Sequence, residues 1–197
     1  MKEVFNILFY LFLFIITLPI LVSIYLYIKF KENTNPIFTQ LRVGQNGKLF
    51  RLYKFKTMVD DNENILKEYL NNNKEAKKEW EKYKKLKNDP RVTKIGKFLR
   101  KTSLDELPQI INILKRDMNL IGPRPYLLEE IENTEFYNLY ITIKPGLSGL
   151  WQVSGRNEVS FQNRIKLDTF YIKNHSLYMD IYIFLKTIKI VLQKTGY

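Results

Sequence analysis

Two adjacent carboxylates, Asp105 and Glu106, stand at the start of an apolar helical stretch in a strongly basic chain. Ser103 and Glu106 fit the spacing of a capping box, and Asp105 before Pro108 is also a good helix N-cap. An aspartate at a helix N-terminus stays ionised and lies where a phosphate is attracted, so it can attack phosphorus. The pair is therefore either a helix cap or the centre of a phosphoryl-transfer site. In such a site the two acids would hold a divalent cation, and hard oxygen ligands favour Mg²⁺.

Basic residues that could bind a phosphate occur in three other segments. Arg124 lies between two prolines in GPRP, where a stiff backbone would aim two donors at one phosphate. Lys54 and Lys56 alternate with aromatic residues in YKFKT, so on a strand they would share one face. Arg156 follows a glycine that allows close approach of the backbone. Each residue alone reads as a surface charge, and their combination with the carboxylates indicates a phosphate site.

The composition restricts the function further. The 197 residues carry a net charge of +12 and contain no cysteine. A thiol nucleophile, a thiolate zinc site and a disulfide framework are thereby excluded. The charge predicts an anionic partner, which is nucleic acid, an anionic membrane or a phosphorylated substrate. The sequence contains no P-loop, no G-x-G-x-x-G after a strand and no H-E-x-x-H motif.

The N-terminal segment predicts contact with a membrane. Val4 to Ile28 are 25 residues without a charge, and a helix of that length reaches roughly 37 Å, more than the hydrocarbon core of a bilayer. A straight spanning helix fits the length. Pro19 near the middle, with Lys2 before the segment and Lys29 and Lys31 at its other end, fits instead a helix that bends and returns to the same face.

The rest of the chain predicts the elements that must position these residues. Residues 37–58 read as a β-hairpin around an Asn-Gly turn. Residues 60–89 are polar and read as a solvated helical excursion, and their interleaved acids argue against a nucleic-acid arm. Two helices are expected to meet near Ser103. Residues 176–194 read as a helix that lies in the membrane interface or, equally, in the core.

Together these motifs resemble the bacterial sugar transferases, the polyprenyl-phosphate phosphoglycosyltransferases with a monotopic membrane domain. The resemblance covers nearly the whole chain, in the blocks QLRVGQNGKLFRLYKFKTM, DPRVTKIGKFLRKTSLDELPQIINILKRDMNLIGPRP, KPGLSGLWQVSGRN and KLDTFYIKNHSLYMDIYIFLKTIKIVL. It implies a mainly helical α+β fold with an N-terminal re-entrant membrane helix, a small β-hairpin and interfacial amphipathic helices around one catalytic domain. Residues 1–30 would form the re-entrant helix. Residues 31–197 would form the cytoplasmic, membrane-associated domain, with the excursion at 60–89.

The resemblance also implies a two-step reaction. Asp105 would attack the β-phosphate of a UDP-sugar and release UMP, and undecaprenyl phosphate would then take the phosphosugar from the enzyme. Asp105 and Glu106 would hold Mg²⁺. Basic positions that line the site in this family match Lys56, Arg100, Arg124 and Arg156. The family breaks its re-entrant helix at a Ser-Pro pair, whereas Leu18 precedes Pro19 here, so a bend is expected without the usual hydroxyl at that position.

The expected partners are a UDP-sugar, undecaprenyl phosphate and the lipid bilayer, with no nucleic acid. The expected location is the cytoplasmic face of the bacterial inner membrane, at the first membrane step of surface glycan synthesis. The identity of the sugar and the oligomeric state, monomer or homodimer, stay open. The alternative is a non-catalytic, basic, membrane-associated module that binds anionic lipid or nucleic acid and uses Ser103 to Glu106 only as a cap.

Overall fold

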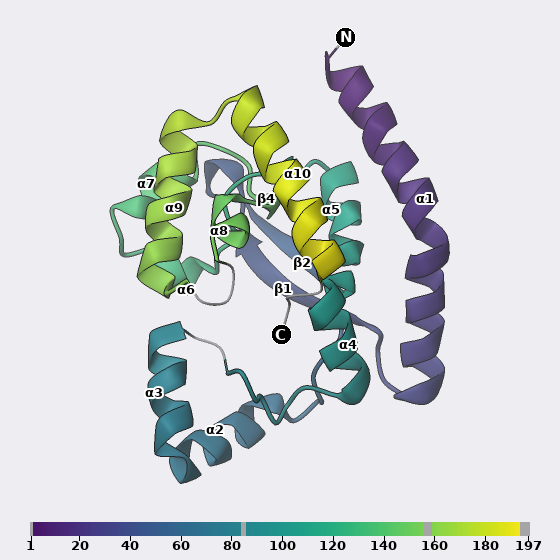
Figure 1. Cartoon of the computed structure of the whole chain (residues 1–197), viewed down its shortest axis with the longest axis vertical. Helices are drawn as coiled ribbons and strands as arrows, with labels where there is room; N and C mark the ends of the chain where they lie inside the picture. Colours follow the sequence, from purple (N-terminus) through teal and green to yellow (C-terminus); the bar gives the residue numbers. More distant parts are fainter. Residues whose placement is uncertain (1, 84–85, 156–158, 194–197) are drawn as a thin grey trace.

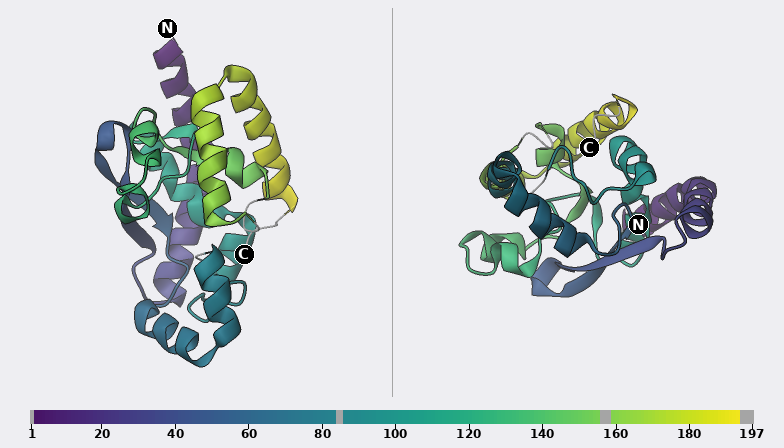
Figure 2. Two further views of the ribbon diagram at one scale, coloured as in Figure 1. Left: turned by 90° about the vertical axis from the view of Figure 1, so that its left-hand side faces the viewer. Right: turned by 90° about the horizontal axis from the view of Figure 1, so that it is seen from below.

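The computed structural model describes residues 2–83, 86–155 and 159–193 of the chain. This part is mainly helical and contains two small two-stranded sheets (Figure 1). The predicted mainly helical α+β class is therefore confirmed. Figure 2 shows the long N-terminal helix along one flank of the molecule and a pair of polar helices at one end.

The N-terminal helix α1 spans Lys2–Lys31 and continues through Pro19. Its ribbon changes direction about midway along its length (Figure 1). Two hydroxyls bond to backbone carbonyls beside the proline: Thr17 Oγ1 donates to Leu13 O at 2.9 Å, and Ser23 Oγ donates to Pro19 O at 2.8 Å. Residues 10–31 are long and apolar enough to cross a membrane, and only a small share of them is buried in the protein. Length and composition are thus compatible with insertion in a bilayer.

The predicted hairpin is confirmed. Strands β1 (Ile37–Val43) and β2 (Leu49–Phe55) pair antiparallel around the short 3-10 turn η1 (Gln45–Gly47). Asn46 and Gly47 have φ values of 58° and 73°, the positive region that the Asn-Gly pair was expected to supply. The hairpin packs on α1 and on the helices that follow it through a core that includes Leu21, Ile28, Phe50, Leu52, Phe55 and Leu99.

Residues 60–89, which we call the arm, leave the hairpin and return to it through a narrow neck. The arm contains α2 (Asn62–Asn72) and α3 (Lys74–Tyr83), so the helices expected there are present. The neck is closed by an antiparallel bridge between Met58 and Val92, with Val59 N donating to Arg91 O at 3.0 Å. The arm is thus an insertion between β2 and the next helix, and the bridge between Met58 and Val92 joins its two ends.

The chain around the two carboxylates differs from the expected cap. Helix α4 (Lys94–Thr102) ends at Ser103, as predicted, and a 3-10 helix η2 (Leu104–Gln109) leads into α5 (Ile110–Leu114). Ser103 has φ 60° and does not cap η2 with its side chain, so no capping box forms. Asp105 lies inside the first turn of η2, and the prediction that it is an N-cap is wrong. The left-handed conformation of Ser103 turns the chain directly into η2, which begins two residues earlier than it would with Asp105 as its N-cap.

The C-terminal half surrounds a second core. Strands β3 (Asn119–Ile121) and β4 (Gly146–Ser148) pair in parallel. The helices around them are α6 (Leu128–Ile131), α7 (Phe136–Tyr140), α8 (Leu150–Val153), α9 (Phe161–Asn174) and α10 (Leu177–Gln193). The core includes Val43, Tyr126, Ile131, Phe136, Tyr140, Tyr171, Ile172 and Ile183.

Helix α10 is only partly a core helix. Ile183 is fully buried, whereas most of its other large apolar side chains are exposed. The exposed side chains are Leu177, Tyr178, Ile181, Tyr182, Phe184, Leu185, Ile188, Val191 and Leu192. Apolar exposure on this scale is typical of a surface that meets a partner or a membrane.

Candidate active site

A cleft of about 1010 Å³ lies between the hairpin, the arm, η2 and the segments around α6 and α8. It is lined by six of the seven residues that the sequence nominated: Lys54, Lys56, Arg100, Asp105, Glu106 and Arg124. Arg156 lies outside the described residues. The structure therefore places residues from four separate segments around one space, while their catalytic and binding roles stay a prediction.

The carboxylates face basic side chains from the hairpin and α4. Lys54 Nζ lies 2.6 Å from Glu106 Oε1, and both side chains are partly exposed. Arg100 donates from Nε to Thr57 Oγ1 at 3.0 Å. Burial lowers the pKa of Arg100, and the negative charges of Asp105 and Asp89 oppose that shift. Asp105 is thus close enough to Arg100 for their charges to interact.

Lys56 is held differently from Lys54. It lies one residue beyond the end of β2, although its backbone N–H still donates to Pro36 O at 2.8 Å. Its ammonium group forms an ion pair with Asp60 and donates to Thr34 Oγ1 at 2.7 Å. Both lysines line the cleft, in agreement with the shared face that the alternation predicted.

Arg124 is fixed by its surroundings. Its Cζ lies 5.8 Å from the ring centroids of both Tyr126 and Trp151. Its backbone N–H donates to Asp168 Oδ2 at 3.0 Å, and the Tyr126 hydroxyl donates to the same oxygen at 2.8 Å. Asp168 in α9 is fully buried, and burial raises its pKa to about 7 although Arg124 and Arg164 favour the ionised form. Such a held guanidinium can bind two oxygens of a phosphate with little loss of side-chain freedom.

Arg42 in β1 is a further arginine that lines the cleft, and no motif had singled it out. Its guanidinium donates to Pro125 O at 3.2 Å and to Gln40 Oε1 at 2.6 Å. Glu130 lies between the two arginines, with an oxygen 3.5 Å from Arg42 Nη1 and the other 3.7 Å from Arg124 Nη2. Burial and the charge of Arg124 lower the pKa of Arg42 to about 10. Arg42 therefore connects the hairpin to the GPRP segment.

The residues of the cleft fit a metal site that is completed by substrate oxygens better than one that is built from protein ligands alone. Within the described residues there is no group of three or more His, Cys, Asp or Glu side chains that could hold a metal ion. Asp105 and Glu106 offer two adjacent carboxylates, one of them paired with Lys54. Mg²⁺ is commonly bound by one or two carboxylates together with substrate phosphates. The pair thus suits Mg²⁺ that arrives with, or is completed by, a phosphorylated substrate.

An acid pair among basic side chains in one cleft, with a long apolar helix elsewhere in the described residues, is compatible with the class of enzymes that act on phosphorylated substrates at a membrane. The comparison with protein families agrees with this class. The family described as bacterial sugar transferase matches residues 1–194. The chain belongs to the bacterial sugar transferase family.

Several characterised or named relatives are similar over most of the chain. The undecaprenyl-phosphate galactose phosphotransferase of Salmonella typhimurium is 48% identical over 198 residues, which are 100% of this chain and 41% of that protein. The UDP-glucose:undecaprenyl-phosphate glucose-1-phosphate transferase of Escherichia coli is 36% identical over 91% of this chain and 38% of its own length. The exopolysaccharide production protein ExoY of Rhizobium meliloti is 42% identical over 90% of this chain and 79% of its own. The chain thus spans about two fifths of the length of the first two relatives.

Proposed function

We propose that this chain transfers a sugar 1-phosphate from a UDP-sugar to undecaprenyl phosphate at the start of surface glycan synthesis. The observation that carries the proposal is the shared cleft of Asp105, Glu106, Arg100 and Arg124. The names of the relatives, which mention undecaprenyl phosphate with galactose or glucose, support the same reaction class.

The proposed chemistry has two steps at one phosphorus atom. The Asp105 carboxylate attacks the β-phosphorus of the UDP-sugar, the bond from that phosphorus to the bridging oxygen breaks, and UMP leaves. A phosphate oxygen of undecaprenyl phosphate then attacks the phosphorus of the aspartyl-phosphosugar, and the carboxylate of Asp105 leaves. Arg100, Arg124 and Lys54 surround the reacting group with positive charge that stabilises both transition states.

Asp105 and Glu106 would hold Mg²⁺, which when bound supplies positive charge to the diphosphate. Lys54 donates to the Glu106 carboxylate and thereby orients it beside Asp105. Excess chelator should therefore stop UMP release, and added Mg²⁺ should restore it. Undiminished activity in chelator would leave the lysine and arginines as the only charge stabilisers.

The reaction is tested with the purified chain in lipid nanodiscs. UMP release is measured with a panel of UDP-sugars in the presence and absence of undecaprenyl phosphate. We expect one or a few sugars to support continuous release only when the lipid acceptor is present. A folded chain that binds anionic vesicles but releases no UMP from any donor would favour the non-catalytic membrane module.

For the membrane segment we propose a re-entrant rather than a spanning α1. Pro19 removes one backbone donor from the helix, and the hydroxyls of Thr17 and Ser23 bond to carbonyls in the adjacent turns. A bend would keep Lys2 and Lys31 on one side of the bilayer, which is the cytoplasmic side where basic residues prefer to lie. The exposed apolar face of α10 would then rest in the interface of the same leaflet.

Single cysteines test this topology against a clean background, because the chain has none. Cysteines at positions 2 and 31 should both be shielded from a membrane-impermeant reagent in intact cells. In Pro19→Leu the helix should straighten, and position 2 should become reactive. Labelling at position 2 but not 31 in the chain with Pro19 would show a spanning helix.

A further inference from the structure

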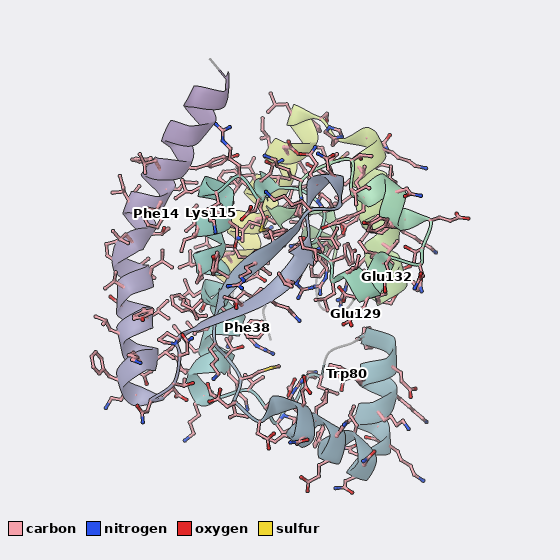
Figure 3. The ribbon with its side chains drawn as sticks, turned by 180° about the vertical axis from the view of Figure 1, so that it is seen from behind. Phe14, Phe38, Trp80, Lys115, Glu129 and Glu132 are labelled. Atoms are coloured by element: carbon pink, nitrogen blue, oxygen red, sulfur yellow. The ribbon has the colours of Figure 1, made fainter. Side chains whose placement is uncertain are left out.

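The cleft is larger than the phosphate chemistry requires. Beyond the dyad and the arginines it extends to the arm, where Trp80 and Leu86 line it, and to α6, where Glu129 lines it. The proposed reaction uses none of these three residues. Figure 3 shows Trp80 reaching from α3 toward the side of the cleft that carries Glu129.

Trp80 is held by the neck of the arm. The Arg91 guanidinium lies over the indole, with its Cζ 5.3 Å from the ring centroid. Arg91 in turn forms a buried ion pair with Asp89, at 2.8 Å from Nε to Oδ1 and 2.6 Å from Nη2 to Oδ2. The indole is only partly buried, so it presents a positioned aromatic surface to the cleft.

Glu129 differs from the adjacent Glu130. Glu130 accepts the backbone N–H of Leu127 at 2.8 Å and lies beside Arg42 and Arg124. Glu129 is exposed, and no hydrogen bond or ion pair to its carboxylate is formed by the residues that the structure describes. Its oxygens are therefore available to donors that enter the cleft.

We propose that Trp80 and Glu129 form the subsite that binds the sugar ring of the donor, an inference that rests on the proposed function. An indole face suits the C–H face of a pyranose, and a carboxylate accepts strong hydrogen bonds from two sugar hydroxyls. Uracil fits this pair less well, because its pairing edge offers a single N–H donor between two carbonyl acceptors, whereas a pyranose offers several hydroxyl donors to a carboxylate. The pair thus reads the part of the donor that distinguishes one UDP-sugar from another.

The experiment compares ligands that differ only by the sugar. In an Asp105→Asn background, which removes the proposed nucleophile, dissociation constants are measured by calorimetry for UDP-galactose, UDP-glucose and UDP, since the names of the relatives mention these two sugars. Trp80→Ala and Glu129→Gln should each weaken UDP-sugar binding about tenfold and leave UDP binding within about twofold. Trp80→Phe keeps an aromatic face and should retain most of the affinity.

Two control variants match these changes in residue type and element. Tyr69→Ala removes an aromatic ring from α2 of the arm, and Glu132→Gln removes a charge at the end of α6. Neither Tyr69 nor Glu132 lines the cleft. Both control variants should bind the same ligands as the background chain does, and circular dichroism of all variants checks that they are folded.

The outcomes separate the subsite from the reaction. Equal losses for UDP and UDP-sugar would place Trp80 against uracil and overturn the sugar subsite, as would unchanged binding in both variants. If the parent chain releases no UMP but the sugar-dependent losses are present, the proposed reaction fails and the subsite stands. If UMP is released normally and the losses are absent, only the subsite fails.

Discussion

The two walls of the cleft are held in place in different ways. The dyad wall, which comprises Lys54, Arg100, Asp105, Glu106 and Arg124, belongs to elements that pack on the two cores. The arm wall comprises Trp80, Leu86 and Asp89 of the arm and Arg91 of its neck, and the arm is an insertion joined through the neck at Met58 and Val92. A catalytic geometry needs the first kind of support, whereas an insertion can change without disturbing a core. We infer that the chemistry resides in the dyad wall and selectivity in the arm wall.

The largest effect should follow from changing the dyad. Asp105→Asn removes the proposed nucleophile while keeping size and shape, so UMP release should fall by roughly 10³-fold or more. Because Asp105 does not cap η2, the melting temperature should hardly change. Retention of substantial UMP release in a folded variant would show that Asp105 is not the nucleophile. It would also contradict the inference that the chemistry resides in the dyad wall.

A smaller loss of activity should follow from replacing Arg124 or the residue that positions it. A lysine cannot form two parallel bonds to a phosphate or lie flat beside Tyr126 and Trp151, so Arg124→Lys should lower kcat/KM roughly 100-fold. Asp168→Asn leaves the Arg124 guanidinium in place but weakens the hydrogen bond to the Arg124 backbone N–H. This change should lower kcat/KM roughly tenfold.

A double-mutant cycle tests whether Asp168 acts through Arg124. If it does, Asp168→Asn should cost almost nothing in activity once Arg124 is already lysine. Fully additive losses would mean that Asp168 supports the site by another route, such as general stability. Melting temperatures of the three variants distinguish the two cases.

Sequence reasoning succeeded where the signal was local. The Asn46-Gly47 turn and the junction of two helices near Ser103 were predicted because backbone conformation at these residues depends on near neighbours. It failed for Asp105 as a cap, because the residue types of a capping box do not predict the left-handed conformation of Ser103.

The remaining site residues depend on distant contacts. Arg42 bonds to Pro125 across 83 positions, and Asp168 bonds to Arg124 across 44. The only indication of Asp168 in the sequence was an acidic residue among the apolar residues of KLDTFYI, and this pattern does not indicate which residue Asp168 contacts. Trp80 read as part of a solvated excursion, because only the fold turns that side of the arm toward the cleft.

The last effect we predict is on stability, and its pH dependence has opposite signs for Asp168, which lies behind the dyad wall, and for Asp89 in the arm wall. Behind the dyad wall, where Asp168 accepts the backbone N–H of Arg124, burial raises the pKa of Asp168 from 3.8 to about 7, so between these values the folded chain keeps a proton that the unfolded chain loses. Stability should therefore fall as pH rises through this window, by at most about 1.4 kcal/mol per pH unit.

At the arm wall, burial of Asp89 is outweighed by the hydrogen bonds and charge of Arg91, and its pKa is lowered below 3.8. The folded chain then binds fewer protons than the unfolded chain, so this ion pair stabilises above pH 4 and the contribution is lost as pH falls through the lowered value. Melting temperatures measured from pH 3 to 8 should show both pH dependences.

Asp168→Asn should remove the decline in stability between about pH 4 and 7. Asp89→Asn should lower the melting temperature at neutral pH, and its difference from the parent should shrink as the pH falls below 4 toward the lowered pKa. A parent chain whose stability rises from pH 4 to 7, with no change in slope in Asp168→Asn, would show that Asp168 is ionised and that its two donors and nearby arginines outweigh its burial.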